Sequence, residues 1–309
     1  MRTRIPLNEN WRFVANIEEG SMLNLNPTMG EIIELPHTVL ELPEHTFLEK
    51  SYQFLSLYSL ELSVPTGDWH HAILHFAGVM NVAKVYVDKH EILVHEGGYT
   101  PFDVDLSPYV KPGQVVLLQV LVDSREIKDI PPFGGMVDYL GYGGIYREVW
   151  LDLYPRHYIK DIQIKTREAL SLQKDEMSLD FAVQLEDESL NKFSMEVRIL
   201  DGQNVMFQHI YEEMNASRCC YMENHTGITR WSIKEPKLYT FEATLKQGKK
   251  VLDQASETFG YRDARFTAEG FVLNGEKIKL VGLNRHQSYP RIGYAAPRLL
   301  QEHDAEIIK

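Results

Sequence analysis

The stretch that decides the fold is Phe271–Lys309, FVLNGEKIKLVGLNRHQSYPRIGYAAPRLLQEHDAEIIK. Asn274-Gly275 separates the apolar run FVL from the run IKLVGL. Asn-Gly suits a two-residue hairpin turn, because both turn residues there need a positive φ. The second run, Ile278–Leu283, is short, apolar and bounded by polar residues, which predicts a strand buried on both faces.

Three polar side chains, Asn284, Arg285 and His286, follow this run directly. Beyond Pro297, apolar residues recur at a helical spacing and predict a helix that continues to Lys309. A strand, polar residues at its carboxyl end, a loop and a helix make up the first βα unit of a TIM barrel. In barrel enzymes that end of the strands carries the active site.

The pattern F-x-L-N-G-x-x-I-x-L-x-G-x-N-R-H, followed by Pro290, Gly293 and the terminal D-A-E-I-I-K, resembles the entry to the catalytic barrel of glycoside hydrolase family 2. The family contains β-galactosidases, β-glucuronidases and β-mannosidases, and N-R-H-Q-S-Y-P is most similar to the β-galactosidase-like branch. A complete barrel takes roughly 250 residues, and far fewer follow Phe271. The resemblance therefore implies the N-terminal portion of a larger protein.

The composition is that of an ordinary globular protein, with 309 residues, 44% hydrophobic and 25% charged. A net charge of −12 argues against nucleic acid as a partner, because phosphates need a basic surface. The first residues lack the apolar core of a secretory signal, and no apolar run is long enough to span a membrane. Adjacent Cys219 and Cys220 cannot supply a disulfide framework or a C-x-x-C zinc site. These features favour a reducing, cytoplasmic location.

Residues 1–157 carry short β-branched and aromatic runs separated by turn residues, which predicts a β-sandwich or jelly roll. The same segment resembles the family's N-terminal sugar-binding jelly roll through six motifs in the expected order. These motifs are Trp11–Phe13, Leu35–His37, Phe76–Val79, Val85–Val87, Gly97–Phe102 with Asp105-Leu106, and Gly143–Arg147.

Residues 158–262 predict a second, immunoglobulin-like sandwich, because Leu179–Leu185 and Phe193–Ile199 alternate cleanly between apolar and polar residues. Asp201-Gly202 predicts the turn that follows. Residues 263–309 are then the first hairpin and βα unit of an incomplete catalytic barrel. The predicted fold is therefore mainly β, and the sequence leaves open whether the tail after Arg265 is ordered.

Retaining members of the family use two glutamates, whose carboxyl groups stand about 5–5.5 Å apart. The acid/base glutamate follows an asparagine. Here Asn8-Glu9 is the sole such pair, at the start of the chain and far from any barrel, so it is read as chance. The sequence thus predicts that both catalytic glutamates lie outside these residues, and it assigns no catalytic residue within them.

Three residues are predicted to contact substrate, namely Arg285, His286 and Asp138. By resemblance, Arg285 is the arginine beside the nucleophile, where a guanidinium keeps a carboxylate ionised. The alternative is a salt bridge that only joins elements of the barrel end. His286 resembles the histidine that binds sugar hydroxyls, and the alternative is a packed loop histidine. Asn284 is read as a residue that fixes backbone.

Asp138 precedes Gly144–Arg147 at the position where β-galactosidases place an aspartate that binds galactose hydroxyls and ligates sodium. A carboxylate suits a diol because it accepts two hydrogen bonds. The alternative is a solvated loop aspartate. The resemblance implies Na⁺ or Mg²⁺ in the full-length enzyme, and no cofactor is required in this chain. The other histidines, at 70, 71, 75, 90 and 95, are read as surface residues of a sandwich.

The leading hypothesis is therefore the N-terminal part of a retaining exo-glycosidase that hydrolyses terminal β-glycosides and resembles β-galactosidases. Its partner would be a carbohydrate, and family members commonly form homo-oligomers. The rival hypothesis is a stand-alone, non-catalytic carbohydrate-binding or interaction module of two β-sandwiches. In its favour, every complete predicted domain is β and no catalytic pair is present.

Overall fold

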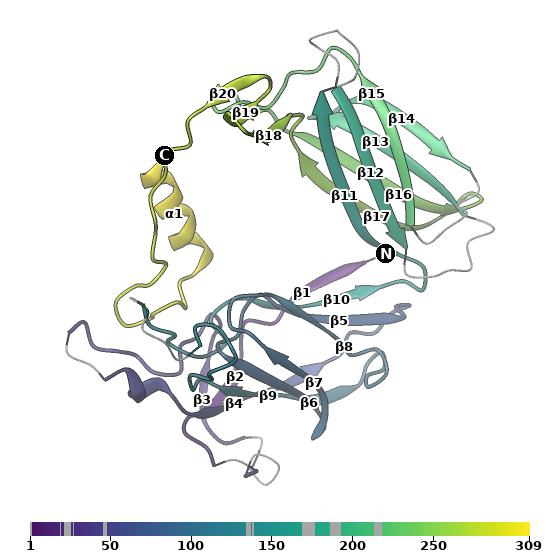
Figure 1. Cartoon of the computed structure of the whole chain (residues 1–309). Helices are drawn as coiled ribbons and strands as arrows, with labels where there is room; N and C mark the ends of the chain where they lie inside the picture. Colours follow the sequence, from purple (N-terminus) through teal and green to yellow (C-terminus); the bar gives the residue numbers. More distant parts are fainter. Residues whose placement is uncertain are drawn as a thin grey trace. The chain divides into compact units, whose positions relative to one another are not determined.

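A computed structural model of the chain describes residues 2–18, 20–21, 26, 28–45, 48–133, 137, 139–168, 177–185, 193–212 and 218–309. Contacts between Cα atoms divide it into two compact units (Figure 1). The first unit contains Thr3–Leu153 together with Asn284–Lys309. The second contains Arg2 and Tyr154–Leu283. Each unit is described by itself.

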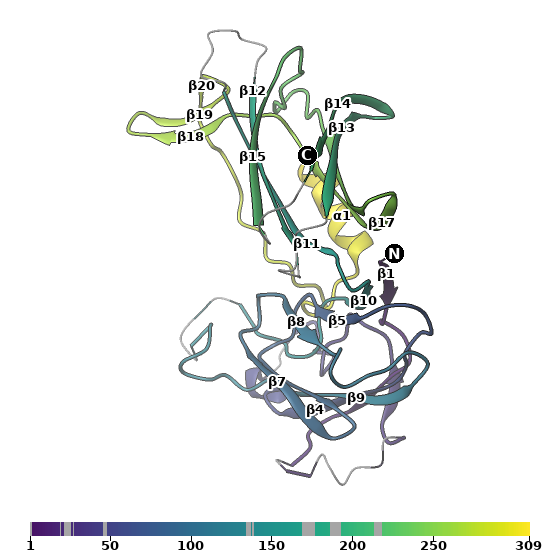
Figure 2. The same ribbon diagram turned by 90° about the vertical axis from the view of Figure 1, so that its right-hand side faces the viewer.

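The first unit is a sandwich of two sheets, visible from a second direction in Figure 2. One sheet has the order β1 (Thr3–Pro6), β10 (Val149–Tyr154), β5 (His71–Phe76), β8 (Phe102–Asp105). The other has the order β3 (Glu31–Ile33), β2 (Trp11–Val14), β4 (Leu55–Ser63), β9 (Val115–Asp123), β6 (Val82–Val87), β7 (His90–Glu96). All neighbours in the six-stranded sheet pair antiparallel. A short 3₁₀ helix, η2 (Glu49–Tyr52), precedes β4.

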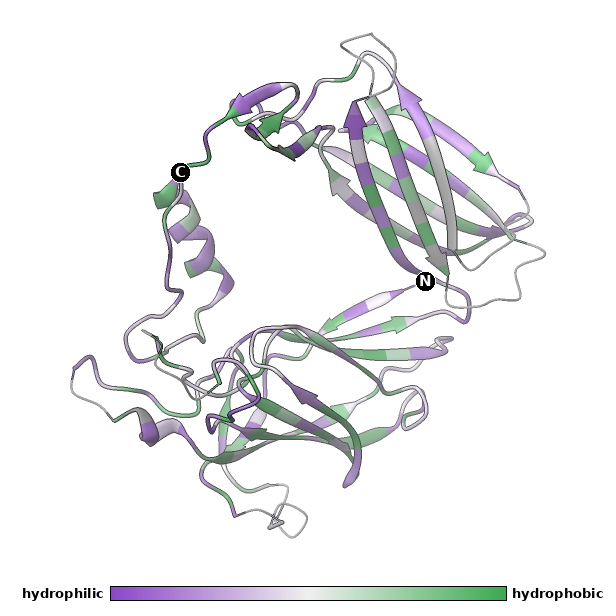
Figure 3. Ribbon diagram, viewed as in Figure 1, coloured by the Kyte–Doolittle hydropathy of each residue, from purple (hydrophilic) through white to green (hydrophobic). Residues whose placement is uncertain are grey.

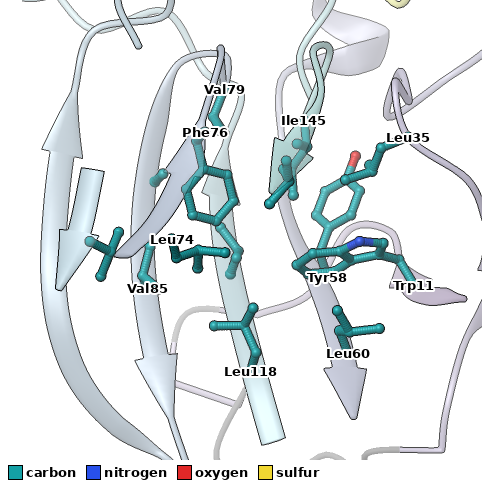
Figure 4. Close-up of a cluster of buried hydrophobic side chains, with 14 of the residues drawn as sticks. Trp11, Leu35, Tyr58, Leu60, Leu74, Phe76, Val79, Val85, Leu118 and Ile145 are labelled. Carbon is teal, nitrogen blue, oxygen red and sulfur yellow. The ribbon is translucent and has the colours of Figure 1, made fainter. Parts of the chain in front are cut away.

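The core of this unit lies between its two sheets. Along β5, Ala72, Leu74 and Phe76 are buried while the alternate residues are half-buried, as the period of a strand requires. Figure 4 shows Leu74 and Phe76 beside Val85 and Leu118, with Trp11 and Tyr58 in the same cluster. The indole N–H of Trp11 donates to the carbonyl of Leu7 at 2.6 Å, so this buried polar group is satisfied.

The second unit is also a sandwich, with antiparallel pairing throughout its two sheets. A three-stranded sheet has the order β11 (Ile159–Glu168), β12 (Met177–Leu185), β15 (Arg218–His225). A four-stranded sheet has the order β14 (Asn204–Tyr211), β13 (Ser194–Asp201), β16 (Tyr239–Gln247), β17 (Lys250–Phe259). Figure 3 shows hydrophilic and hydrophobic residues alternating along these strands.

The alternation predicted for this sandwich is confirmed, because one face of β12 and of β13 is buried against the other sheet. The buried residues are those expected from the sequence: Leu179, Phe181, Val183, Leu185, Phe193, Met195, Val197 and Ile199. The turn after β13 is also confirmed, with Gly202 at φ +59° between β13 and β14. The prediction of a mainly β chain with two successive sandwiches is therefore correct.

A small sheet follows the sandwich of the second unit in the chain. It contains β18 (Ala264–Thr267), β19 (Gly270–Leu273) and β20 (Glu276–Ile278), paired antiparallel. The predicted Asn-Gly hairpin joins β19 to β20, with Asn274 at φ +51° and Gly275 at φ +85°. Both values are positive, as a two-residue turn of this kind needs.

The strand predicted over Ile278–Leu283 is wrong for this chain, because β20 ends at Ile278 and the next residues form no ladder. Val281 and Leu283 are 85% and 90% exposed. A strand buried on both faces needs neighbours on both sides, and none of the described residues supplies them. No barrel forms within the described part of the chain, so the barrel start stays a prediction.

The helix predicted after Pro297 is confirmed as α1 (Arg298–Ile308). It belongs with Asn284–Pro297 to the first unit. The tail after Arg265 is therefore ordered, a question that the sequence left open. Over the residues that the structure describes, no helix has the length and apolar character needed to cross a membrane.

Candidate functional site

The segment that carries Arg285 and His286 is anchored on the first unit by a tight turn. Tyr289 and Gly293 exchange backbone hydrogen bonds of 3.0 Å in each direction. Arg291 forms an isolated bridge with Leu42 of the sandwich. Tyr294 is 8% exposed, and the two alanines after it are as well buried. The segment has little secondary structure but a fixed attachment.

Tyrosines surround this attachment. The ring of Tyr294 lies 4.9 Å from that of Tyr142 and 5.8 Å from that of Tyr146. The hydroxyl of Tyr146 donates to the carbonyl of Gly98 at 2.6 Å. A side chain at Gly98 would overlap the sulfur of Met80, so this glycine allows a close backbone approach. Residues of two family-like motifs, at 97–102 and 143–147, thus meet around Tyr294.

Arg285 binds an aspartate of the helix. Its Nε donates to Oδ2 of Asp304 at 2.7 Å, and a terminal nitrogen reaches the same oxygen and the hydroxyl of Tyr289 at 3.0 Å. The Tyr289 hydroxyl also donates to Asp304. Within the described structure, the arginine is therefore held by a salt bridge in its own unit.

The partners of Asp304 fix its charge. Hydrogen bonds from Tyr289 and Arg285 lower the pKa of Asp304, so it is ionised at neutral pH. The hydrogen bond to Asp304 raises the pKa of Tyr289 and of Arg285. The tyrosine thus keeps its proton and the guanidinium its charge. This arrangement positions a cation and a hydroxyl near the surface, and it supplies no proton donor or acceptor that titrates near neutral pH.

His286 is exposed, and its imidazole contacts the ring of one tyrosine of the sandwich. Its imidazole stands 6.3 Å from the ring of Tyr139, in an edge-on arrangement with 64° between the planes. Tyr139 follows Asp138 in the chain. Asp138 itself lies outside the described residues, so its place relative to Arg285 and His286 stays a prediction.

A groove of about 470 Å³ lies on the first unit, between α1 and the segments at 147–148 and 287–296. Its lining combines cations, carboxylates, an amide and one tyrosine, namely Arg147, Arg298, Glu148, Glu302, Gln287 and Tyr294. Arg298 is paired with Glu302 one turn along α1, at 2.7 Å. The groove therefore offers hydrogen-bonding groups of both kinds, as a binding site for a hydroxylated ligand requires, and Gln287, which follows His286 in the chain, is one of its lining residues.

One charged cluster was missed by the sequence analysis. His75, which was read as a surface residue, has only 15% of its side chain exposed and stacks on Trp150 at 5.1 Å. Its Nδ1 lies 2.5 Å from Asp103 and its Nε2 lies 3.2 Å from Asp152. Asp152 also accepts two hydrogen bonds from Arg4, at 2.8 and 2.7 Å.

The cluster shifts the pKa of its members. Burial alone would lower the pKa of His75, but hydrogen bonds to Asp103 and Asp152 and their charges outweigh it and raise the pKa to about 9. Burial alone would raise the pKa of Asp152, but Arg4 and His75 outweigh it and lower the pKa. The signal in the sequence was the alternation of β5 and β10, which places His75 and Asp152 on the same face of one sheet.

Metal binding finds no support in the described residues, which contain no group of three His, Cys, Asp or Glu side chains able to hold an ion. The predicted metal ligand Asp138 and the side chains of Cys219 and Cys220 are outside the description. Among the described residues, histidines 71 and 75 contribute to no such group.

Comparison with known proteins finds family models and relatives that match this chain. Residues 45–155 match the sugar-binding domain model of glycosyl hydrolases family 2, and residues 157–262 match a second model of that family. A β-galactosidase of Thermoanaerobacterium thermosulfurigenes is 42% identical over the whole chain, and one of Thermoanaerobacter pseudethanolicus is 32% identical. The chain spans 44% and 42% of these two proteins.

A solved structure shows the same fold over the full chain. The β-glucuronidase of Bacteroides uniformis superposes with a TM-score of 0.83 at 24% identity, covering 100% of this chain and 38% of that one. Both sandwiches and the tail after Leu283 fall within the matched region. By its two matching models and by its identity to the β-galactosidases, the chain belongs to glycoside hydrolase family 2.

Proposed function

We propose that this chain is the N-terminal part of a retaining β-glycosidase that removes terminal sugars and prefers β-galactosides. The observation that carries the proposal is its 42% identity, along all of its length, to a β-galactosidase. The geometry agrees, because a loop of the sugar-binding sandwich and the segment after Leu283 come together at Tyr139 and His286. The chain spans less than half of its relatives, so the activity of the whole protein is part of the proposal.

The proposed reaction needs two carboxyl groups that lie outside these 309 residues. One glutamic acid would protonate the glycosidic oxygen while a second glutamate attacks the anomeric carbon. The bond to the leaving group breaks, and a glycosyl-enzyme forms. Water, deprotonated by the first glutamate, would then hydrolyse that intermediate with net retention. The described residues would bind and orient the sugar, and none of them would exchange a proton with the reacting atoms.

Arg285 and His286 have separate parts in this proposal. The imidazole of His286 has one donor and one acceptor when neutral, which suits a pair of sugar hydroxyls. The guanidinium of Arg285 has five donors, and Asp304 and Tyr289 use some of them. The remaining donors would hold the nucleophilic carboxylate ionised and in place. Arg285 would then bridge two carboxylates.

Asp138 would add the contact that selects galactose, by accepting hydrogen bonds from two hydroxyl groups. Sodium ligation by Asp138 belongs to the same proposal. The described residues hold no group of three His, Cys, Asp or Glu that could bind an ion, and Asp138 is not among them. A cytoplasmic location and a homo-oligomeric state, both expected from the sequence, also stay predictions.

A second candidate function is a non-catalytic carbohydrate-binding module. The salt bridge between Arg285 and Asp304 favours it, because this arginine is already satisfied without a nucleophile. In that case His286, Tyr139 and the adjoining groove would bind a sugar without cleaving it.

The reading frame beyond Lys309 and the activity of its product separate the two. The first proposal expects the frame to continue, and expects its purified product to hydrolyse nitrophenyl β-galactoside faster than nitrophenyl β-glucuronide, with retention seen by proton NMR. A stop codon directly after Lys309 would instead support the binding module. Preference for the glucuronide would contradict the assignment of galactose while leaving the reaction class intact.

A further inference from the structure

A further groove lies in the second unit. It measures about 580 Å³ and lies where β11 and β17, the edge strands of the two sheets, contact each other. Its lining includes Lys165, Thr166, Trp231, Leu238, Thr258 and Arg262. Such a volume is in the range of ordinary small-molecule sites. The groove uses neither Arg285 nor His286, which belong to the first unit.

The charge of this groove is positive in a chain of net charge −12. Lys165 and Arg262 both line it, and none of the described residues in its lining is acidic. The groove lined by Arg147 and Glu148 and the one lined by Arg198 and Glu242 each combine cations with carboxylates. Neither Lys165 nor the Arg262 guanidinium forms an ion pair with any described residue. Asp180 is paired with Lys165 across β11 and β12, but the ion pair that it forms is with Arg167.

Arg262 is held in a defined position. Its guanidinium carbon lies 5.4 Å from the ring centre of Trp231. The hydroxyl of Thr166 donates to the carbonyl of Arg262 at 2.7 Å, and the Arg262 N–H donates back to that hydroxyl at 3.0 Å. Trp231 is fixed in turn through its backbone, since its amide N–H donates to the carbonyl of Tyr261 at 2.8 Å and its carbonyl accepts from the side-chain amide of Asn274 at 3.0 Å.

A guanidinium over an indole keeps its N–H groups available at the edge of its plane. Such an arginine matches an oxyanion with two parallel hydrogen bonds, and holding it in advance reduces the entropy lost on binding. Lys165 adds a second charge. Leu238, which is 51% exposed, offers an apolar surface to a ring face, and the exposed Thr258 offers a hydroxyl.

From this combination we infer that the groove binds a sugar ring that carries one negative group, a carboxylate, sulfate or phosphate. Arg262 and Lys165 bind the oxyanion. Leu238 packs against the apolar face of the ring, and Thr258 bonds to a ring hydroxyl. Thr166 acts as a positioning residue through the backbone of Arg262 and does not touch the ligand.

Titration calorimetry on the 309-residue chain tests the site with five probes: glucuronic acid, galactose 6-sulfate, galactose 6-phosphate, galactose and sodium sulfate. At least one charged sugar is expected to bind at least tenfold more tightly than galactose and sodium sulfate, and its affinity should fall with added salt. The charged probe that binds best identifies the anion. Equal binding of galactose, equal binding of sulfate alone, or no binding by any charged sugar would overturn the inference.

Variants test whether binding depends on the residues of this groove or only on the positive charge of the unit. Arg262→Gln should weaken the best charged probe at least tenfold, and Lys165→Gln should weaken it several-fold. Lys250→Gln removes a positive charge from the opposite end of β17 and should change nothing. Thr166→Val should weaken binding, and Thr166→Ser should restore it because the hydroxyl returns. An unchanged affinity in Arg262→Gln, or an equal loss in Lys250→Gln, would contradict the assignment even if the sugars bind elsewhere.

Discussion

The ring of Tyr139 lies 6.3 Å from the ring of His286 and meets it edge-on, although one belongs to a loop of the first sandwich and the other to the tail. The contact joins the two parts of the sequence from which substrate contacts were predicted. It forms within one compact unit, in which Tyr294 and the turn at Tyr289 hold the tail on the sandwich. Tyr139 and His286 thus lie together in one unit, and the substrate contacts of Arg285, His286 and Asp138 stay predictions.

A substitution of His286 tests whether this cluster binds sugar. In the complete enzyme of the proposal, His286→Leu should lower kcat/KM for nitrophenyl β-galactoside about 10- to 100-fold, because one or two hydrogen bonds to the substrate are lost. Histidine 303 lies exposed on α1, so His303→Leu is the matched control and should leave kcat/KM unchanged. Equal effects of the two changes would remove His286 from the site.

Loss of the carboxylate at Asp304 should loosen the tail. Asp304→Asn removes the ion pair with Arg285 and weakens the hydrogen bond from Tyr289, so trypsin should cut after Arg285 faster. Glu306→Gln removes a negative charge from the same helix and is expected to leave the cleavage rate as it was. If both variants resist trypsin like the unchanged chain, the salt bridge does not hold the tail.

Gly293 should tolerate no side chain. An added Cβ would overlap the ring of Tyr142, and the residue has φ +55°. Gly293→Ala is therefore expected to destabilise the first unit by about 2–4 kcal/mol, from backbone strain and overlap together. Gly248 has φ +58° with open space around it, so Gly248→Ala should cost only about 1 kcal/mol in the second unit. Scanning calorimetry, with the two unfolding transitions assigned, measures both; equal costs would contradict the overlap.

The His75 cluster predicts a stability that falls in alkaline solution. The pKa of His75 is raised from 6.5 to about 9, so the charged form stabilises the fold fully below about pH 6.5 and is lost as the pH rises through 9. The charged form of His75 contributes about 2 kcal/mol to the free energy of unfolding, a value reduced for solvent screening because Asp103 is largely exposed. His75→Gln should lose this amount at pH 6 and almost none at pH 10, measured by urea unfolding.

The control for this pH dependence is His70→Gln, which removes a neighbouring histidine that lies outside the cluster. Its free energy of unfolding should match that of the unchanged chain at both pH values. A loss in His75→Gln that is the same at pH 6 and pH 10 would show that packing against Trp150, and not charge, is what this histidine contributes.

Much of the fold could be predicted because the alternation of apolar and polar residues within each strand indicates which of its faces is buried. Residues such as Phe181 and Val197 alternate with polar neighbours, and Asn274-Gly275 specifies its own turn. The run Ile278–Leu283 failed for the opposite reason. Its apolar character indicates burial, but burial of a strand depends on neighbouring strands that the described residues do not contain.

The candidate site was less predictable than the fold. Arg285 and His286 were identified by resemblance, whereas the partner Asp304 was not, because a salt bridge between a loop and a helix depends on how both are placed. The His75 cluster was missed since it joins residues of β1, β5, β8 and β10 that are far apart in sequence. The grooves could not be predicted either, since each depends on where several loops end.

The most direct test of the central claim compares the 309-residue chain with the product of its complete reading frame on nitrophenyl β-galactoside. We predict no hydrolysis by the 309-residue chain, because both catalytic glutamates are expected outside it, and retaining hydrolysis by the complete product. Turnover by the purified 309-residue chain, or a complete product that hydrolyses no β-glycoside, would contradict it.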